Sequence, residues 1–183
     1  MSNVTLVIII VVAVVIVVAL VAFFVSRGRR AQQERQERAR EQFGPEYERT
    51  VQERGSERQA EKELRKRRER LEDEVQPLSE ESRKRYEERW LGVERTFVDD
   101  PWASLEEADR VVADILAERN FPRDSRQEAS KGVGVMHPQV VEDFREAQRV
   151  HRDATGSEGE AELEEMRRAI QMYRSVYERL TGG

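Results

Sequence analysis

The stretch LEEMRRAIQMYRSVYERL, residues 163–180, contains the most regular apolar pattern of this chain. Its large apolar residues follow alternating spacings of three and four, the a and d positions of a heptad repeat: Leu163, Met166, Ile170, Tyr173, Tyr177 and Leu180. This spacing predicts an α-helix with an apolar stripe along one face. We expect the stripe to pack on helices formed by residues 79–151, which gives a monomer. Pairing with a second copy of the chain, a homo-oligomer, is the alternative.

Two helices that could receive this stripe are predicted upstream. The first should begin at Ser79, a good N-cap residue, and it carries one apolar face at spacings of four, three and four: Tyr86, Trp90, Val93 and Phe97. Asp99 and Asp100 precede Pro101, a combination typical of a helix N-cap and first turn. The second helix therefore starts there and should end before Pro122.

Turns divide the rest of this region. Gly132 and Gly134 predict a loop, and a further helix should follow His137 and Pro138, with apolar residues along one face: Val140, Val141, Phe144, Ala147 and Val150. Residues 155–159 predict a turn, and Ser157 with Glu160 fits a capping box at the start of the next helix. Because no segment alternates like a strand, residues 77–183 are expected to form a small all-α bundle domain.

Residues 27–76 are predicted to form a charged helical stalk. The stalk should break at Gly44 and Pro45, and Gly55 weakens the helix that follows. Its apolar residues are few and widely spaced: Tyr47, Val51, Leu64, Leu71 and Val75. A coiled coil needs a fuller apolar seam, so we expect a solvated helix here.

Residues 1–26 are predicted to be a transmembrane anchor. Within them, residues 4–25 include a single polar residue, Thr5. A helix of that length spans about 33 Å, enough to cross the hydrocarbon core of a bilayer. A cleaved signal peptide would require basic residues before the apolar run and small residues at its end, where this chain has Phe23 and Phe24. We therefore expect a retained anchor, with secretion after signal cleavage as the alternative.

The charges after the apolar run predict the orientation of the anchor. No lysine or arginine precedes the run, whereas several arginines follow it: Arg27, Arg29, Arg30, Arg35, Arg38 and Arg40. The positive-inside rule then places the N-terminus outside and the C-terminal domain in the cytoplasm. Residues 27–70 carry net charge +5 and residues 71–183 carry −10. We expect the arginines nearest the bilayer, at positions 27, 29 and 30, to contact anionic lipids.

No catalytic, cofactor-binding or metal-binding residues are predicted. The chain has no cysteine, and its two histidines, His137 and His151, follow no metal-binding spacing. Asp99 and Asp100 are better explained as helix caps than as an acid–base pair. The stretch KGVG, residues 131–134, lacks the order of a phosphate-binding loop. These observations favour a protein that is not an enzyme and has no cofactor.

A nucleic-acid partner is not expected either. The basic run LRKRR, residues 64–68, is interrupted on its flanks by Glu61, Glu63 and Glu69, and the domain that follows it is acidic. Nucleic-acid binding requires a continuous basic surface that displaces counterions from phosphates. The run is therefore interpreted as a solvated helix face.

Three stretches resemble a family of uncharacterised, largely actinobacterial proteins: FGPEYERTV at residues 43–51, PLSEESRKRYEERW at 77–90 and FVDDPWASLEEADRVV at 97–112. Members of that family look like single-span membrane or secreted proteins with a polar helical region. The resemblance covers most of residues 43–180 and implies this architecture, without any known activity or catalytic residue.

Three functional hypotheses follow. The favoured one is a membrane-anchored interaction or scaffold protein that meets an unknown protein partner through its cytoplasmic helical domain. The alternative is a structural, stator-like or coiled-coil membrane protein, a layout similar to that of the b subunit of ATP synthase. An enzyme is a weaker third hypothesis, because the sequence contains no recognisable arrangement of catalytic residues.

Overall fold

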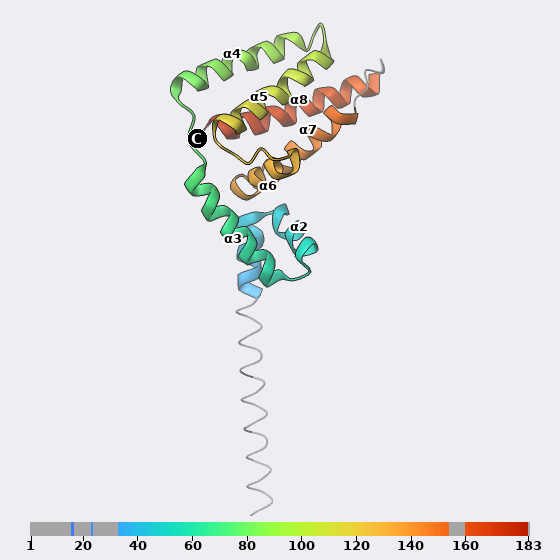
Figure 1. Ribbon diagram of the computed structural model, residues 1–183. Helices are drawn as coiled ribbons and strands as arrows, with labels where there is room; N and C mark the ends of the chain where they lie inside the picture. Colours follow the sequence, from blue (N-terminus) through green and yellow to red (C-terminus); the bar gives the residue numbers. More distant parts are fainter. Residues whose placement is uncertain (1–15, 17–22, 24–32, 154–159, 183) are drawn as a thin grey trace, which may run out of the picture. The chain divides into compact units, whose positions relative to one another are not determined.

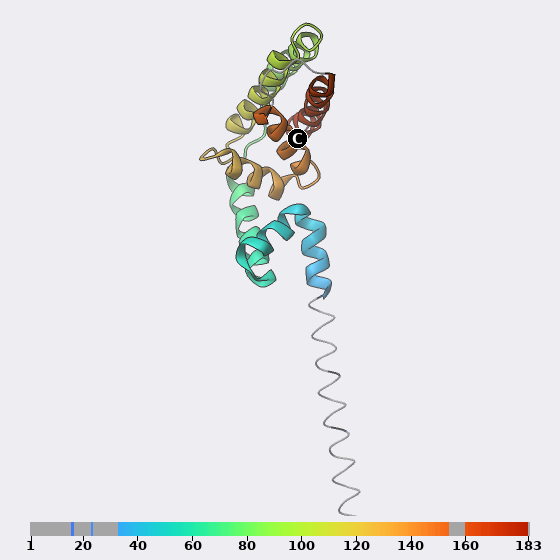
Figure 2. The same cartoon turned by 90° about the vertical axis from the view of Figure 1, so that its right-hand side faces the viewer.

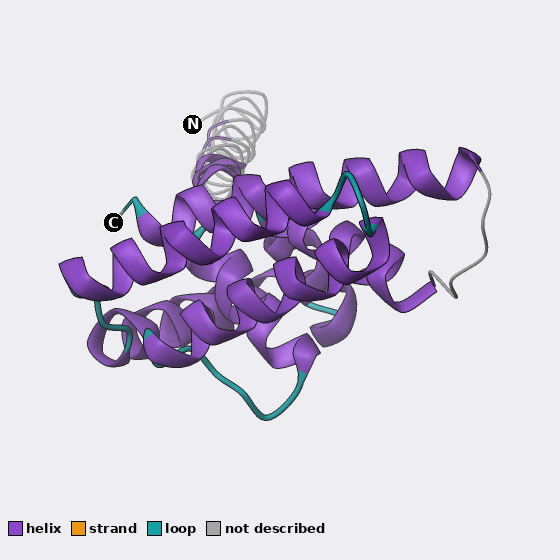
Figure 3. Cartoon of the chain, turned by 90° about the horizontal axis from the view of Figure 1, so that it is seen from above, coloured by secondary structure: helices purple, strands orange, loops and turns teal. Residues whose placement is uncertain are grey.

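A computed structural model describes Ile16, Phe23, residues 33–153 and residues 160–182 (Figure 1). The chain divides into two compact units, residues 1–41 and residues 42–183. In the first unit, residues 33–41 are helical. Throughout the described ranges the regular elements are helices, and Figure 3 shows no strand among them. The all-α prediction is confirmed for this part of the chain.

The second unit is built from seven described helices. In chain order they are α2 (Pro45–Arg54), α3 (Glu57–Glu74), α4 (Glu80–Thr96), α5 (Pro101–Glu118), α6 (Arg126–Met136), α7 (Val141–Asp153) and α8 (Glu160–Thr181). Helix α8 packs on both α5 and α7, and α4 packs on α5. Helices α2, α3 and α6 contact one another, and α6 joins them to α7 (Figures 1 and 2).

The stripe of α8 packs inside the unit, as the sequence predicted. Met166, Ile170, Tyr173 and Leu180 are buried in a core shared with α4, α5 and α7. Leu163 differs from the prediction, because it is one of the exposed large apolar side chains. Two smaller residues that the a/d pattern omits, Ala169 and Val176, are fully buried. They widen the stripe into the broader face that a helix needs when it contacts more than one neighbour.

Local capping also follows the prediction. The Ser79 hydroxyl accepts a hydrogen bond from the Ser82 amide at 3.0 Å, and the Asp100 carboxylate accepts one from the Ala103 amide at 2.9 Å. The predicted turn with its capping box at residues 155–159 lies outside the described residues. The predicted loop at residues 132–134 is wrong: these residues lie inside α6.

Close packing explains the two glycines in α6. A Cβ atom added at Gly134 would lie 2.3 Å from Cγ of Glu46 on α2, and one added at Gly132 would lie 3.2 Å from the Phe121 ring. A side chain at position 134 would therefore overlap Glu46, whereas one at position 132 would need only a small shift of the Phe121 ring.

Part of the predicted stalk belongs to the compact unit, which begins at Gln42. The break at Gly44 is observed, and Gly55, with φ of 67°, separates α2 from α3. The apolar residues of this segment are few, but several are fully or almost fully buried: Phe43, Tyr47, Ala60, Leu64 and Leu71. Residues 43–74 are thus not a solvated helix throughout, because α2 and α3 pack against each other and against α6.

Arg119 joins the end of α3 to the rest of the unit. Its buried guanidinium donates to the backbone carbonyls of Gln76, at 3.1 Å, and Leu180, at 2.8 Å. Burial lowers the pKa of this arginine. Asn120 follows in the left-handed conformation, with φ of 63°, and its side-chain amide donates to the Glu74 carbonyl at 3.1 Å. The C-termini of α3, α5 and α8 are therefore held together by these two residues.

Candidate functional site

A charged groove with a volume of about 430 Å³ lies between α2, α6 and α7. Its walls contain six cationic and four anionic side chains: Arg49, Arg126, Lys131, Arg145, Arg149, Arg152, Glu46, Glu53, Glu142 and Glu146. Gln127, Ser130 and Gln148 complete the lining. The groove therefore carries a net charge of about +2 when these groups are ionised.

Glu46 and Arg145 form the base of the groove. Pro45 occupies the first turn of α2 and Gly44 precedes it with φ of 51°, so the chain turns sharply before Glu46. Glu46 is only 2% exposed, and its carboxylate pairs with Arg145, whose side chain is 17% exposed. Breaking such a buried pair by removing one partner leaves an uncompensated charge and costs about 3–5 kcal/mol. This pair fixes α2 against α7.

The ion pairs at the rim are weaker. Arg49 lies 3.7 Å from Glu142, and Lys131 lies 3.6 Å from Glu53, so both pairs bridge α2 to its neighbours. Both are partly exposed, and pairs of this kind contribute about 0–1 kcal/mol each. Such pairs exchange readily for charges supplied by a partner.

Arg149 carries a strong set of partners within α7. Its guanidinium donates to Glu146 at 2.7 Å and to Asp153 at 3.1 Å. The hydrogen bond from Arg149 is the largest cause that lowers the pKa of Glu146, and the same bond raises the pKa of Arg149. Both groups therefore stay ionised across the neutral range.

The lining of the groove contains one hydroxyl and no histidine among the described residues. The Ser130 hydroxyl, the one hydroxyl among the described lining residues, is buried and donates to Oε1 of Gln148 at 3.1 Å. Neither histidine is in the lining. A nucleophile beside a general base, the arrangement that covalent catalysis requires, is not found in the described walls. The groove offers charges and hydrogen-bond donors to a partner.

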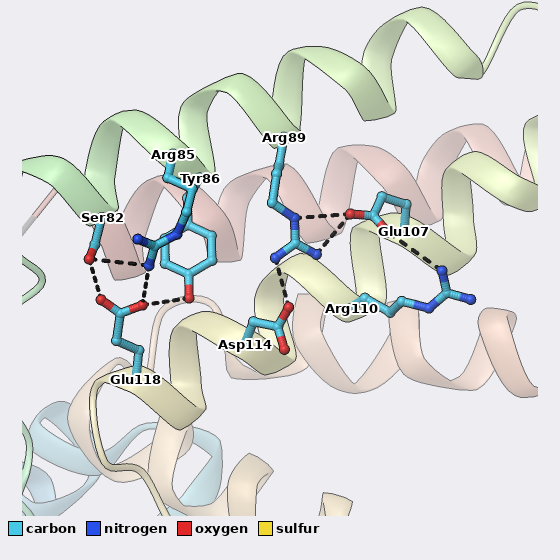
Figure 4. A network of polar contacts seen from close by, with 8 residues as sticks. All are labelled: Ser82, Arg85, Tyr86, Arg89, Glu107, Arg110, Asp114 and Glu118. Atoms are coloured by element: carbon cyan, nitrogen blue, oxygen red, sulfur yellow. Dashed lines mark hydrogen bonds and ion pairs between the residues drawn. The ribbon is translucent and has the colours of Figure 1, made fainter.

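A second polar network joins α4 to α5 (Figure 4). Glu118 accepts hydrogen bonds from Ser82, from Arg85 at 2.6 Å and from the Tyr86 hydroxyl at 2.8 Å. The hydrogen bond from Ser82 is the largest cause that lowers the pKa of Glu118. Arg89 donates to Glu107 at 2.8 Å and to Asp114 at 2.7 Å, and both carboxylates lie N-terminal to Glu118 on α5. These contacts hold α4 against α5.

The histidines are placed in different surroundings. His137 follows α6, and neither of its ring nitrogens has a hydrogen-bond partner within the described part of the chain. His151 stacks on Trp102, with ring centroids 5.5 Å apart, and its Nδ1 lies 3.6 Å from Asp109. The described residues contain no cluster of three or more side chains able to hold a metal ion.

The residues predicted to meet lipid are not in this part of the structure. The arginines at positions 27, 29 and 30 lie outside the described residues, as does the span of residues 4–25 apart from Ile16 and Phe23. A search of the described helices finds none with both the length and the apolar character needed to cross a bilayer.

Comparisons with protein-family models, with curated proteins and with solved structures find no match to this chain.

Sequence reasoning did not identify the groove. Its lining comes from three segments, residues 46–53, 126–131 and 142–152, each of which reads as an ordinary charged helix. Charged side chains at helical spacing are usually solvated, and only tertiary packing shows which of them converge. The one local sign is Glu46, an acid in a first turn that begins with Pro45, where it also complements the helix dipole.

Proposed function

We propose that this protein is a membrane-anchored interaction module, whose groove between α2, α6 and α7 binds an acidic segment of a partner protein. Residues 4–25 would provide the anchor, and the unit of residues 42–183 would present the groove in the cytoplasm. The observation that carries the proposal is the groove itself, where cations outnumber carboxylates by six to four around a buried ion pair.

The proposed partner follows from the charges. Arg152 has no ion pair among the described residues, Arg126 pairs with Asp109 but is 52% exposed, and the rim pairs of Arg49 and Lys131 are partly exposed. Carboxylates of a partner can pair with Arg152 and compete for the other cations. Binding of this kind is weakened by salt, because exposed ion pairs are screened over about 8–10 Å at physiological ionic strength.

Site-specific photo-crosslinking in native membranes tests the proposal. A photoreactive residue at Gln127, an exposed residue of the lining, should give a discrete crosslinked protein. Reversal of two groove charges, Arg149→Glu with Arg152→Glu, should abolish that product. The matched control is Arg110→Glu, since Arg110 is also exposed but lies on α5 and outside the groove.

Two outcomes would refute this function. A crosslinked product that survives the double reversal would show that groove charge plays no part in binding. Equal loss in the double reversal and in the Arg110 control would show that net charge, and not the groove, is responsible. The membrane placement is tested separately: a cytoplasmic reporter fused after Gly183 should be active and a periplasmic one inactive.

A further inference from the structure

A second cavity, with a volume of about 340 Å³, lies between α5, α6 and α7. Half of its lining residues are apolar: Ala113, Leu116, Ala117, Pro122, Ala129 and Phe144. The volume is within the range of small-molecule sites, which combine apolar walls with a few polar groups that orient the ligand. The polar groups of this cavity therefore decide what it could bind.

Asp109 is the most deeply placed charge in the lining. Its side chain is 12% exposed, and Oδ1 accepts a hydrogen bond from the Tyr173 hydroxyl at 2.7 Å. Burial, and then the charge of Asp109, raise the pKa of Tyr173 well above its ordinary value, so this hydroxyl remains a donor. The carboxylate is thus held in one orientation by a residue from the core.

The second oxygen of Asp109 has a partner that can be exchanged. Oδ2 accepts from Arg126 at 3.1 Å and lies 3.6 Å from Nδ1 of His151. The Arg126 side chain is 52% exposed, so its guanidinium reaches the carboxylate from solvent. A buried anion whose main cationic partner is exposed favours replacement of that partner by a ligand cation.

The other charges of the cavity lie nearer to solvent. Asp114 is already paired with Arg89 at 2.7 Å (Figure 4), and its side chain is 54% exposed. Arg123 is exposed at the mouth. A carboxylate ligand would bring its charge toward the buried Asp109, whereas a cation would be attracted to it. The electrostatics therefore favour a cationic group at depth.

We propose that this cavity binds small amphiphilic amines, whose ammonium group replaces the Arg126 guanidinium on Oδ2 of Asp109. The apolar body of the amine lies against Phe144 and the small side chains of α5 and α6. No covalent step is involved. Arg126 acts as a competitor for the site, because it occupies the same oxygen in the absence of ligand.

Three ligands that share a phenylethyl group separate the contribution of the charged or polar group from that of the apolar body. The probes are 2-phenylethylamine, 2-phenylethanol and 3-phenylpropanoate, titrated calorimetrically into the full chain in zwitterionic lipid nanodiscs, with empty nanodiscs as the blank. We expect the amine to bind with a Kd of about 0.1–1 mM, and at least about tenfold more tightly than the alcohol, as a charge-assisted hydrogen bond implies. Equal binding of all three, or preference for the carboxylate, overturns the proposal.

Variants of the two charged residues give opposite results if the proposal is correct. Asp109→Asn should reduce amine affinity at least about tenfold, while Arg126→Gln should increase it, because the competitor is removed. Weaker amine binding in Arg126→Gln contradicts the proposed exchange. Should Asp109→Asn not fold, Ala113→Leu, which keeps both charges and narrows the mouth of the cavity, must reduce binding; an unchanged affinity would place the amine elsewhere.

Discussion

Acid should destabilise this protein through one partly buried histidine. His137 has no hydrogen-bond partner at either ring nitrogen among the described residues, and it lies beside the Phe121 ring at 6.3 Å between centroids. Burial, followed by the positive charges of Arg119 and Arg179, lowers its pKa from 6.5 to about 4. The native state therefore holds His137 neutral at a pH where the unfolded chain is protonated.

The sign and size of the effect follow from this difference. The neutral native form contributes its full stability above pH 6.5, and the contribution is lost as the pH falls from 6.5 toward 4. Protonation linkage gives a loss of about 2.5 kcal/mol between pH 7.5 and pH 4.5 as a ceiling. Because the ring is partly exposed, solvent screening reduces the expected loss to about 1–2 kcal/mol.

Urea unfolding of residues 42–183, followed by circular dichroism at pH 7.5 and pH 4.5, measures this loss. The matched variant is His137→Leu, which fills the same apolar surroundings and cannot titrate. Carboxylates such as Glu118 and Glu146, whose pKa values are lowered below 4.5, protonate mainly at more acidic pH and are present in both proteins. Between pH 7.5 and pH 4.5, the free energy of unfolding should fall by about 1–2 kcal/mol less in the variant than in the parent. Equal losses would refute the assignment of the acid effect to His137.

Three further predictions concern packing. Gly134→Ala should lower the free energy of unfolding by about 1–3 kcal/mol in urea titration, because the added Cβ would overlap Glu46. Gly92→Ala, the control, has open space around it and should raise the free energy of unfolding by about 0.5–1 kcal/mol. Destabilisation by both substitutions would contradict the packing argument. Residues 42–183 should sediment as a monomer. Their free energy of unfolding should exceed that of the fragment of residues 77–183 by at least about 2 kcal/mol, the contribution of one buried large apolar side chain. Trp90→Ala should cost about 3–5 kcal/mol, since Trp90 is buried and stacks on Tyr177 at 4.7 Å, and an unchanged melting temperature would show that it is not core.

The predictable parts of the fold depend on contacts close in sequence. The caps at Ser79 and Asp100 form hydrogen bonds three residues away, so the residues themselves specify them. The apolar stripe of α8 was predictable for the same reason, because its period needs no knowledge of the neighbours. Its correct width was not, since the burial of Ala169 and Val176 depends on α5 and α7 lying on both sides.

The errors have one physical cause, which is that long-range packing changes the meaning of a residue. Gly134 predicts a loop by propensity, yet it lies in α6, where Glu46, far away in sequence, occupies the space of its missing side chain. Arg119 reads as a surface cation, yet its guanidinium binds carbonyls of Gln76 and Leu180. Such contacts leave no periodic pattern, so neither the folded part of the predicted stalk nor the groove could be derived from the sequence.

The same charges contribute to the fold and to the proposed binding, but at different depths. Glu46 is buried and Arg145 is mostly buried, and their separation would cost more than a partner's single charge could return, so this pair stays closed and α2 stays in place. The rim pairs of Arg49 and Lys131 are partly exposed and weak, so a partner can replace them without unfolding the wall. One wall of the groove is α2, a helix from the charged segment next to the predicted anchor. Each rim carboxylate that a partner supplies stabilises the position of α2, and loss of α2 packing removes one side of the groove. Partner binding and retention of this segment in the folded unit should therefore strengthen each other.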